Sequence, residues 1–501
     1  MGPRAIWNGL RLEKPFFPQF LVLQRQVPRA SLFQTRAVDC DYASFIADSK
    51  NVYLSTSILK SENVFYSHIV ARSRDVVDAV AMGDGELLYE NIEGAKNARS
   101  AYLVRSRECL NSAYLFDCVN CQQCSMSTNL RNKKFVMRNR QYTESAYNEE
   151  LRKMNMGSFT VAKQLREEFM TMIARSLHKF GQIVKSVDCF GDNIMNAKSA
   201  HHCFDIHGGE NLKYVTRAVN AKESYDVTGN AAELVYEGVA TIFDTYDAKF
   251  STFVEAVQRS RYSDTCQNGT DLFGCIGIRK KSYCVLNKQY TKAEYDALVP
   301  KIVEHMNAMP YIDAGGRVYR YGEFFPIELS PFAYNETLAN DHFPLTRDAA
   351  IGAGYRWRDE EKKNYVSTIA ADRLPDDIRD VQDSILQEVI ACAHAGACND
   401  RCTVAFRLVP YELQFYRRMN IPLPRLCPNC RHYDRFRKRN PLKLWRRKCT
   451  CSGLKSENSI YANTAQHVHG DAPCPNEFET SYAPDRPETV YCEQCYNAEV
   501  V

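Results

Sequence analysis

The residues best suited to chemistry are the cysteines of the last hundred residues. Four of them form two close pairs about 25 residues apart, namely Cys398 with Cys402 and Cys427 with Cys430. Two such pairs supply the four tetrahedral thiolates that Zn²⁺ prefers, and a site closed by four protein ligands is structural and not catalytic. Cys392 is an alternative to either cysteine of the first pair. We therefore predict a first zinc ribbon over residues 392–438.

A second set of cysteines repeats the pattern. Cys492 and Cys495 form one close pair. The other two ligands come from Cys449, Cys451 and Cys474, and His467 and His469 are outside candidates. We prefer Cys474 together with either Cys449 or Cys451. The sequence thus predicts a second zinc ribbon over residues 439–501, and two structural Zn²⁺ ions in all.

The alternative for these cysteines is burial in a core or pairing in disulfides. Disulfides belong to oxidising compartments, and residues 1–10 lack the apolar core of a signal peptide. We therefore expect reduced, metal-bound thiols in a cytoplasmic protein. No apolar run approaches the roughly 18 residues that a membrane helix needs. Contact with a membrane is accordingly not expected.

Between the two predicted ribbons lies the densest positive charge of the chain, residues 431–448, here called the basic bridge. Guanidinium groups in such a segment contact phosphates, and interleaved aromatic rings stack on bases. The rings are Tyr433, Phe436 and Trp445. The sequence predicts contact with RNA, DNA or a ribonucleoprotein through Arg435, Arg437, Lys438, Arg439, Arg446 and Arg447. The alternative is a solvated linker whose aromatic residues belong to the core.

Two clusters in the rest of the chain resemble sites but are better explained as structure. Residues 201–207 hold three histidines, and because alternate strand residues face opposite ways, His201 and Cys203 should face opposite to His202. Cys118, Cys121 and Cys124 have metal-like spacing, but a second copy of the surrounding segment keeps only Cys266, which favours inward-stacked small residues. No hydrolase triad, phosphate loop or dinucleotide fingerprint stands out. We predict no catalytic residue.

The elements that carry these residues begin with a short repeat. Polar corners and β-prone runs recur every twelve residues from residue 49, as in Ser49-Lys-Asn-Val-Tyr53 and Ser61-Glu-Asn-Val-Phe65. Each run is too short to bury a face alone, but stacked about 4.8 Å from its neighbours it can do so. This predicts a narrow β-solenoid over residues 39–155. Residues 129–143 and the helical pattern after them would cap its open edge.

The capping segment occurs twice, which indicates an internal duplication. Residues 278–291 match residues 130–143 in order, at a separation near 148 residues. In the second copy, Thr291 and Glu294 form a capping box. We predict a mainly β chain with two tandem duplicated short-rung β-solenoids, each with a capping hairpin-helix segment, followed by two zinc ribbons. The second solenoid spans residues 187–307.

The remaining segments are connections. With 501 residues, 45% apolar and 25% charged, the chain is an ordinary globular one with room for about three domains. Residues 1–38 are expected to be an irregular lead-in that packs on the strands after it, with a removable transit peptide as the alternative. Residues 156–186 predict a connecting amphipathic helix. Residues 308–391 predict an extended aromatic-rich wrap that ends in a helix after Leu374.

Several motifs resemble a family of uncharacterised zinc-ribbon proteins with cysteine-rich solenoid repeats, frequent in bacteria of the candidate phyla radiation (Patescibacteria). The motifs that carry the resemblance are Lys14-Pro-Phe-Phe17, Asn129-Leu-Arg-Asn132 with Gln141-Tyr142, Pro331-Phe-Ala-Tyr-Asn-Glu-Thr337, Tyr411-Glu-Leu-Gln-Phe-Tyr416, Leu423-Pro-Arg-Leu-Cys-Pro-Asn-Cys430, Arg439-Asn-Pro-Leu-Lys-Leu-Trp445 and Tyr482-Ala-Pro-Asp-Arg-Pro487 through Cys495. The resemblance covers nearly the whole chain. It implies the solenoid architecture and bound zinc, and it implies no activity.

The sequence supports three functional hypotheses. The first is a non-enzymatic zinc-binding protein that contacts nucleic acid through the basic bridge. The second is a protein-interaction or assembly scaffold that uses the solenoid faces. The third is an enzyme with a site near residues 201–207 of the second solenoid, although clustered carboxylates of the kind that glycosidases use are not evident there. Exposure or burial of the bridge side chains distinguishes the first hypothesis from the second.

Overall fold

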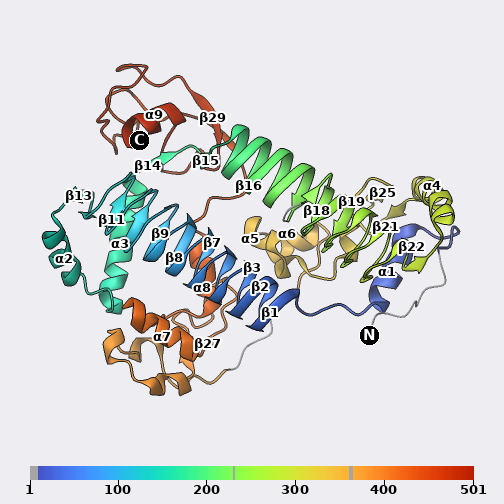
Figure 1. Ribbon diagram of the computed structural model, residues 1–501, viewed down its shortest axis with the longest axis horizontal. Helices are drawn as coiled ribbons and strands as arrows, with labels where there is room; N and C mark the ends of the chain where they lie inside the picture. The colour runs from blue at the N-terminus through green and yellow to red at the C-terminus, as the bar shows by residue number, and fades with distance from the viewer. Residues whose placement is uncertain (1–9, 230–231, 360–364) are drawn as a thin grey trace.

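The computed structural model describes residues 10–229, 232–359 and 365–501. These residues form 30 β-strands and nine α-helices, and most of the strands belong to two large sheets (Figure 1). One sheet has 13 strands and the other has nine. The prediction of a mainly β chain is therefore confirmed. Within the described ranges, no helix is both long and apolar enough to span a membrane.

The 13-stranded sheet is a coil of the chain, here called the first β-coil. Its strands are β1 (Gln34–Asp41), β2 (Ser44–Tyr53), β3 (Thr56–Leu59), β4 (Glu62–Phe65), β5 (His68–Ala71), β6 (Arg74–Val77), β7 (Val80–Gly83), β8 (Glu86–Ala95), β9 (Ala98–Val104), β10 (Ala113–Phe116), β11 (Ser125–Thr128), β12 (Val136–Met137) and β13 (Arg140–Gln141). Parallel partners lie twelve residues apart, as in Ser44 with Thr56 and Thr56 with His68. The predicted twelve-residue period is confirmed.

The coil turns because every third residue adopts a left-handed backbone conformation. Asn51, Leu54, Ser57 and Lys60 have φ values of 52°, 43°, 60° and 47°, and the series continues along the coil. A bend at every third residue gives four bends in each twelve-residue turn. The ten-residue strands β2 and β8 therefore turn a corner and pair with strands on two sides. As a result, β8-β6-β4-β2-β3-β5-β7 form a closed ring of seven strands.

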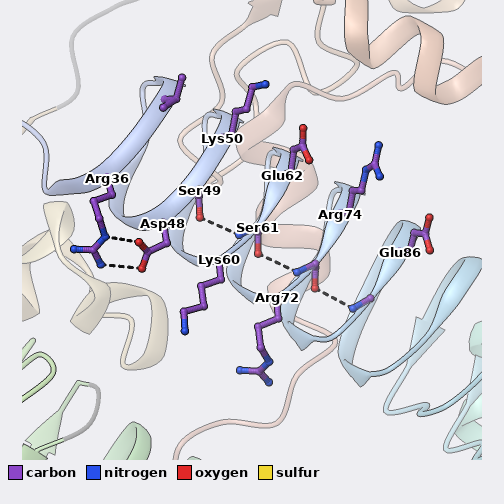
Figure 2. Close-up of a pocket in the computed structure, with 13 residues that line it drawn as sticks. Arg36, Asp48, Ser49, Lys50, Lys60, Ser61, Glu62, Arg72, Arg74 and Glu86 are labelled. Carbon is purple, nitrogen blue, oxygen red and sulfur yellow. Dashed lines mark hydrogen bonds and ion pairs between the residues drawn. The ribbon is translucent and has the colours of Figure 1, made fainter.

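The same period of three decides which side chains face the interior of the coil. Ile46, Val52, Ile58 and Val64 are at most 2% exposed and form an aliphatic core. Two other inward rows hold small residues. In one of these rows, the Ser61 N–H donates to Ser49 Oγ at 3.1 Å, and the Ser49 hydroxyl donates to the Ala47 carbonyl at 2.8 Å (Figure 2). Each buried hydroxyl thus donates to a backbone carbonyl of its own turn and accepts from a backbone N–H of the next turn.

Further along the first β-coil, cysteines take the small inward positions. Cys109, Cys118, Cys121 and Cys124 are at most 1% exposed and share a core with Leu103 and Leu115. Their thiols donate to backbone carbonyls, as Cys118 Sγ does to Phe116 O at 3.4 Å. Among the described residues, no candidate metal group includes them. The interpretation of Cys118, Cys121 and Cys124 as inward-stacked small residues agrees with this packing.

The nine-stranded sheet forms a second β-coil. Its strands are β15 (Ile183–Val184), β16 (Val187–Thr228), β17 (Ala232–Glu233), β18 (Tyr236–Val239), β19 (Thr245–Thr252), β20 (Gln258–Arg261), β21 (Thr270–Phe273), β22 (Ser282–Val285) and β23 (Lys288–Gln289). Parallel partners lie 11 to 13 residues apart, as in Ile183 with Ile194, Tyr236 with Lys249, and Tyr246 with Gln258. The two β-coils run in opposite directions in Figure 1, so the second returns beside the first.

Each β-coil ends in the capping arrangement that the sequence predicts. The antiparallel pair β12–β13 leads into helix α2 (Glu144–Lys153), and the pair β22–β23 leads into α4 (Lys292–Ala308). Tyr147 of α2 and Tyr295 of α4 are buried against the last turns. The capping box of Thr291 and Glu294 is present. Helix α3 (Phe159–Arg175), predicted as the connecting helix, joins the two β-coils and packs on β10 and β11.

The lead-in differs from the prediction. Residues 16–26 form helix α1 (Phe16–Gln26), and this helix packs on the far end of the second β-coil, not on the strands next to it in the sequence. The Phe16 ring lies 5.4 Å from Phe273, and the Phe17 ring lies 5.5 Å from Tyr262. Pro15 and Pro18 are compatible with helix because both lie where the backbone N–H groups have no partner within the helix. Residues 1–9 lie outside the described residues.

The helix predicted after Leu374 is absent from the described residues of that segment. Short 3₁₀ turns take its place: Ala371–Arg373, Ile378–Asp380 and Asp383–Gln387. The Asp377 side chain binds the neighbouring backbone here, since it accepts the Arg379 N–H at 2.9 Å. Such local bonds compete with helix formation. The rest of the predicted wrap contains β24 (Tyr311–Ile312), β25 (Val318–Tyr319), the 3₁₀ turns Ile327–Leu329 and Tyr334–Glu336, α5 (Leu338–His342) and α6 (Arg347–Gly352).

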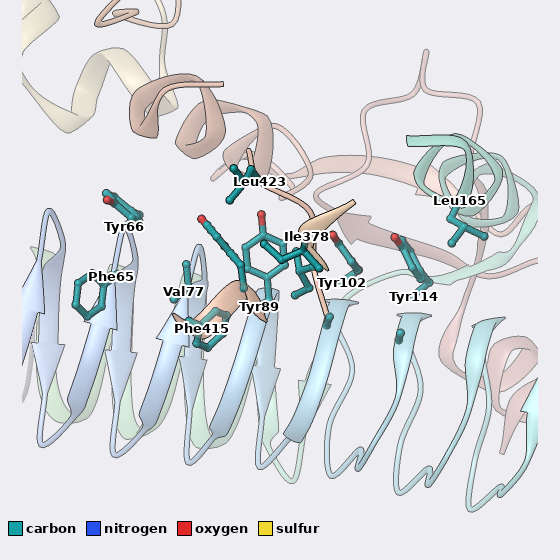
Figure 3. Close-up of a cluster of buried hydrophobic side chains, with 14 of the residues drawn as sticks. Phe65, Tyr66, Val77, Tyr89, Tyr102, Tyr114, Leu165, Ile378, Phe415 and Leu423 are labelled. Carbon is teal, nitrogen blue, oxygen red and sulfur yellow. The ribbon is translucent and has the colours of Figure 1, made fainter. Parts of the chain in front are cut away.

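The C-terminal part covers the flank of the first β-coil and reaches the second. Its elements are β26 (Ile390–Ala391), β27 (Ala405–Phe406), α7 (Pro410–Met419), α8 (Pro428–Phe436), β28 (Trp445–Lys448), β29 (Glu477–Thr480), β30 (Thr489–Tyr491) and α9 (Glu493–Val500). Phe65 of the coil stacks on Tyr411 at 4.7 Å, and Tyr89 meets Tyr416 at 5.8 Å. Figure 3 shows this shared core. Strand β30 pairs in parallel with β14 (Leu177–Lys179), which lies between the two β-coils in the sequence.

The left-handed corners give a testable prediction. Asn63 has a φ of 56° and bonds Asn51 and Asp75, at 2.7 Å each, in the turns before and after. The Asn63→Val substitution puts a β-branched residue at this corner, which costs about 1–2 kcal/mol in backbone strain alone, and it removes both bonds. We expect a lower midpoint of thermal unfolding. Gln258→Val, at an exposed position of β20 that precedes the corner at Arg259, is the control, and an equal loss in both variants would contradict the corner constraint.

Candidate metal centres and the basic bridge

The first candidate metal centre is a group of four buried cysteines, Cys392, Cys402, Cys427 and Cys430, here called the first cysteine group. Their sulfur atoms all lie within 4.8 Å of one another. Cys427 is the N-cap of α8 and Pro428 occupies the first helical position, so the first turn of the helix brings Cys427 and Cys430 to the same place. Cys392 directly follows β26, and Cys402 lies three residues before β27, so both belong to the segment between the two strands.

Cys398, predicted as a ligand of this site, lies beside the first cysteine group and not within it. Cys392, the alternative from the sequence, takes its place. Cys398 Sγ is 3.6 Å from Cys430 Sγ, and it belongs to a separate cluster with His394 and Asp400. Cys392 was difficult to choose from spacing because nine residues separate it from Cys402. Its position directly after β26 (Ile390–Ala391), two residues from the buried Ile390, is the signal that favours it.

The second candidate centre comprises Cys449, Cys474, Cys492 and Cys495, here called the second cysteine group. These four buried sulfur atoms also lie within 4.8 Å of one another. The local design repeats that of the first group, because Cys492 is the N-cap of α9 and accepts the Cys495 N–H at 3.5 Å. Of the predicted ligands, Cys449 is included. Cys451 lies outside this group and clusters with His467, His469 and Cys495.

Both cysteine groups have the chemistry of a closed metal site. In the described residues none of the 20 cysteines forms a disulfide, and backbone N–H groups point at the sulfur atoms of both groups. The Cys427 N–H donates to Cys392 Sγ at 3.3 Å, and the Cys492 N–H donates to Cys449 Sγ at 3.2 Å. Such bonds stabilise the thiolate form that metal binding requires. Four thiolates leave no coordination position for a substrate, so these centres fit a structural role.

The basic bridge is packed into the molecule and contacts acidic residues of the first β-coil. Arg435 is 1% exposed. Its guanidinium donates to Asp78 at 2.6 Å and to the Tyr66 carbonyl at 2.8 Å. Arg431, also buried, shares Asp78 at 2.8 Å and reaches Glu412 at 3.3 Å. These arginines neutralise carboxylates that would otherwise be buried without a partner.

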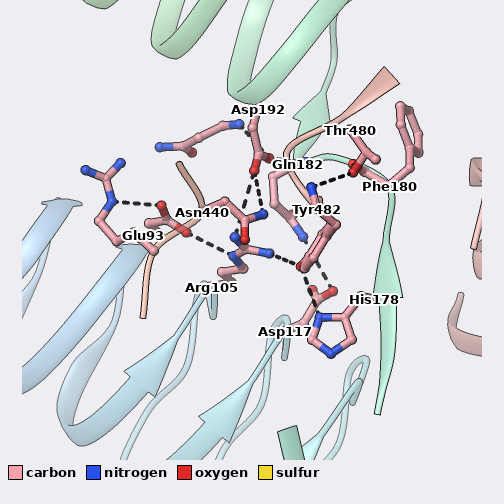
Figure 4. Close-up of polar contacts among 12 residues, drawn as sticks. Glu93, Arg105, Asp117, His178, Phe180, Gln182, Asp192, Asn440, Thr480 and Tyr482 are labelled. Carbon is pink, nitrogen blue, oxygen red and sulfur yellow. Dashed lines mark hydrogen bonds and ion pairs between the residues drawn. The ribbon is translucent and has the colours of Figure 1, made fainter. Parts of the chain in front are cut away.

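Arg439 joins the two β-coils. It is 9% exposed and binds Glu93 of the first coil at 2.9 Å and Asp205 of the second at 2.7 Å. Arg105 of the first coil also binds Glu93 at 2.9 Å and lies 3.8 Å from Asp192 of the second (Figure 4). We call Arg439, Glu93, Asp205, Arg105 and Asp192 the clasp. It is an alternating chain of buried charges across the junction between the coils.

The other predicted nucleic-acid residues are also paired or partly covered. Arg437 binds Asp400 at 2.7 Å, and Arg446 binds Glu477 at 2.7 Å with 79% of its side chain exposed. Arg447 donates to the Ala483 carbonyl at 3.1 Å. Lys438 contacts Asp434 at 2.8 Å, and burial lowers the pKa of its amine to about 8. In the packing seen here, Arg435 and Arg439 can reach a phosphate only by leaving their carboxylate partners.

The aromatic side chains of the bridge pack inward as well. Tyr433 donates to Asp341 at 2.7 Å, and the Phe436 ring lies 5.0 Å from His342. Burial, together with nearby arginines, lowers the pKa of His342 to about 4 and that of His432 to about 3. These histidines are therefore neutral near pH 7. Tyr433 and Phe436 are thus in contact with Asp341 and His342 of α5. The prediction that the bridge rings are free to stack on bases does not hold for these two rings.

The histidine cluster of residues 201–207 follows a period of three and not of two. Cys203 and Ile206 face the interior of the second β-coil, while His201 and His202 are both partly exposed. The expectation that His201 and Cys203 share a face was wrong, because His202 has a left-handed φ of 53° and turns the chain. His201 lies 3.2 Å from Asp188, and His202 stacks on Tyr214. Within the described residues, this cluster is part of no candidate metal group.

Comparison of the chain with protein-family models finds no match, and comparison with curated proteins finds no relative. Its function is therefore argued from its own residues and their arrangement. The features that carry most information are the two cysteine groups, the clasp and the exposed faces of the β-coils.

The first cysteine group predicts which thiol is a ligand. Replacing Cys392 by serine should lower the metal content by one ion per chain, because three thiolates and a hydroxyl bind Zn²⁺ more weakly than four thiolates. Replacing Cys398 by serine should leave the metal content unchanged. Native mass spectrometry of both variants measures the difference. Loss of an ion from the Cys398 variant alone would mean that the sequence-based ligand set is the correct one.

The clasp predicts a large loss of stability from one substitution. Arg439→Ala leaves Glu93 and Asp205 without their shared partner, and removing one member of a buried charge pair costs about 3–5 kcal/mol. Arg446→Ala, in the same basic bridge but on the surface, should change the free energy of unfolding by no more than about 0.5 kcal/mol. Urea unfolding of the two variants checks this contrast. Similar values for both would mean that Arg439 does not hold the coils together.

Proposed function

We propose that this chain is a non-enzymatic, zinc-stabilised assembly scaffold. In this interpretation the two β-coils are tandem β-solenoids, the two cysteine groups each hold a structural Zn²⁺ ion, and the basic bridge fastens the solenoids to each other. The working surface is then an exposed solenoid face. The observation that carries the proposal is the burial of the bridge arginines against coil carboxylates, since it assigns the densest positive charge of the chain to internal contacts.

A long groove on the first β-coil is the best candidate for the working surface. It is shallow and open, with a volume of about 920 Å³, and the backbone of Ser49 and Ser61 lies along its floor (Figure 2). One wall carries Arg36, Asp48, Lys60 and Arg72, and the other carries Lys50, Glu62, Arg74 and Glu86. Arg36 is already paired with Asp48, and Arg72 with Asp84. The first wall is therefore largely neutralised from within the chain.

Positively and negatively charged side chains alternate along the second wall. Lys50, Glu62, Arg74 and Glu86 occupy equivalent positions of successive turns, and neighbouring strands lie about 4.8 Å apart. In the part of the chain that the structure describes, no ion pair holds any of these four side chains. A row of this kind favours a partner whose charges alternate with the same spacing.

A second copy of the same chain provides such a row. If two copies meet with their β-coils antiparallel, Lys50 faces Glu86 and Glu62 faces Arg74, and each pair occurs twice around a twofold axis. An interface that uses one patch on both subunits is the commonest arrangement of homo-oligomers. Exposed ion pairs contribute only about 0.2–1 kcal/mol each. The charges therefore set the register and the salt dependence of the contact, while its strength comes from the whole face.

A charge exchange within one chain tests the proposal. The wild type should self-associate in analytical ultracentrifugation, and added salt should weaken the association. Glu62→Lys puts like charges together and should abolish it. The double variant Glu62→Lys with Arg74→Glu restores opposite charges across the twofold axis and should recover it. A wild type that is monomeric at every concentration, or a double variant as defective as the single one, would overturn the proposed assembly.

A binding measurement with nucleic acid tests the alternative function, contact with RNA or DNA through the basic bridge. Arg446 and Lys448 are the most exposed cations of the basic bridge, with side-chain exposures of 79% and 82%. Their replacement by alanine breaks no buried pair. Salt-sensitive binding of single-stranded or double-stranded RNA or DNA that this double variant loses would support the nucleic-acid function instead. We expect no binding above background, because the other bridge cations are engaged within the protein.

A further inference from the structure

The second cysteine group has a neighbour that shares one of its thiols. Cys451 Sγ, His467 Nδ1, His469 Nε2 and Cys495 Sγ all lie within 4.8 Å of one another, and here they are called the sulfur–histidine group. His467 Nδ1 is 3.3 Å from Cys451 Sγ, and His469 Nε2 is 3.3 Å from Cys495 Sγ. Two thiols and two imidazoles are a common tetrahedral ligand set for Zn²⁺.

The outer nitrogen of each imidazole is held as it is in metal-bound histidines. His467 Nε2 bonds Glu499 Oε1 at 2.8 Å, and His469 Nδ1 bonds the Ala472 carbonyl at 2.6 Å. An oxygen acceptor at that nitrogen places the ring proton there, so the inner nitrogen carries a lone pair directed at the thiols. A carboxylate or carbonyl behind the ring is the usual support of a metal-ligating histidine. The two rings use different inner nitrogens, yet both lone pairs face the same point.

Glu499 is itself fixed in place. Its side chain is fully buried beside His467 and accepts the backbone N–H groups of Thr464 at 2.9 Å and Ala465 at 3.1 Å. The Tyr461 hydroxyl also donates to it at 3.2 Å. Glu499 lies on α9 one turn after Cys495, so a single helix positions both the shared thiol and the carboxylate. The loop that carries His467 is thus held to this helix.

A simple hydrogen bond between a thiol and an imidazole does not account for the whole arrangement. It explains the pair Cys451 and His467, and it leaves unexplained why a second imidazole, fixed in the opposite tautomer, points at Cys495. We propose that the sulfur–histidine group binds a second metal ion, so that the C-terminal module holds a two-metal centre in which the Cys495 thiolate bridges both ions. The seven ligands are Cys449, Cys451, His467, His469, Cys474, Cys492 and Cys495.

The first cysteine group has a comparable neighbour without this support. His394, Cys398, Asp400 and Cys430 lie close together, and Cys430 is shared with the first group. However, Arg437 binds both carboxylate oxygens of Asp400, at 2.7 and 3.3 Å, and neutralises it. In the described residues, His394 Nδ1 has no hydrogen-bond partner. The proposal is therefore limited to the C-terminal module, and His394 provides a matched control.

Metal counting is the first test. The protein is expressed with zinc, and its metal content is measured by native mass spectrometry beside the double variant His467→Ala with His469→Ala. The variant should hold one ion fewer per chain than the wild type, while His394→Ala should hold as many as the wild type. Equal metal content in the double variant and the wild type would overturn the proposal.

X-ray absorption of the zinc-loaded wild type keeps the test valid if the double variant fails to fold. Neither cysteine group contains a nitrogen ligand, so zinc–imidazole scattering and zinc–zinc scattering arise only from the proposed site. We expect both signals. Sulfur scattering alone would overturn the two-metal centre and leave the proposed scaffold intact, because the scaffold needs only the two cysteine groups. Absence of any bound metal would overturn both.

Discussion

The left-handed conformation at every third residue is the constraint on which this structure depends. It folds each turn into four short sides, and only one residue in three faces the interior. The interior of each β-coil is therefore narrow and holds aliphatic, serine or cysteine side chains in single rows. So narrow a core buries little apolar surface per residue, and a small core stabilises a fold weakly. The outward aromatic rows, such as Tyr89 and Tyr102, must be covered by other parts of the chain.

The C-terminal part supplies that cover, and its two cysteine groups are the features that could hold so irregular a segment in place. Helices α7 and α8 pack Tyr411 and Tyr416 on the flank of the first β-coil. The first cysteine group ties the start of α8 to the β26–β27 hairpin. Ligand binding by four thiolates contributes folding free energy directly. Arg431 and Arg435 of α8 and Arg439 after it are then close enough to the coils to pair with their buried carboxylates.

The sequence was most informative where the signal is local. The cysteine pairs Cys427/Cys430 and Cys492/Cys495, the twelve-residue repeat and the capping box of Thr291 and Glu294 depend on neighbouring residues, and the structure contains each of them, whereas the predicted pair Cys398/Cys402 is divided between two clusters. It was least informative about side chains whose contact partners lie far away in the sequence. Arg439 looks like a surface cation until Glu93 and Asp205, more than 200 residues earlier, are placed beside it. The side chains of residues 201–203 were misassigned for another reason, because a period of two holds for an extended strand and not for a strand with a left-handed bend at every third residue.

The order of these contacts along the chain has a consequence for folding during synthesis. Both β-coils leave the ribosome before Arg439, and strand β30, which pairs with β14, is among the last segments to be made. The coils can therefore form turn by turn from contacts only twelve residues long, whereas the clasp has to wait until Arg439 has been made. Until then the carboxylates of the junction remain hydrated and the coils are free to move apart. In the proposed scaffold, metal uptake by the two cysteine groups is then the event that completes the fold, and the supply of the metal sets how long each new chain stays open.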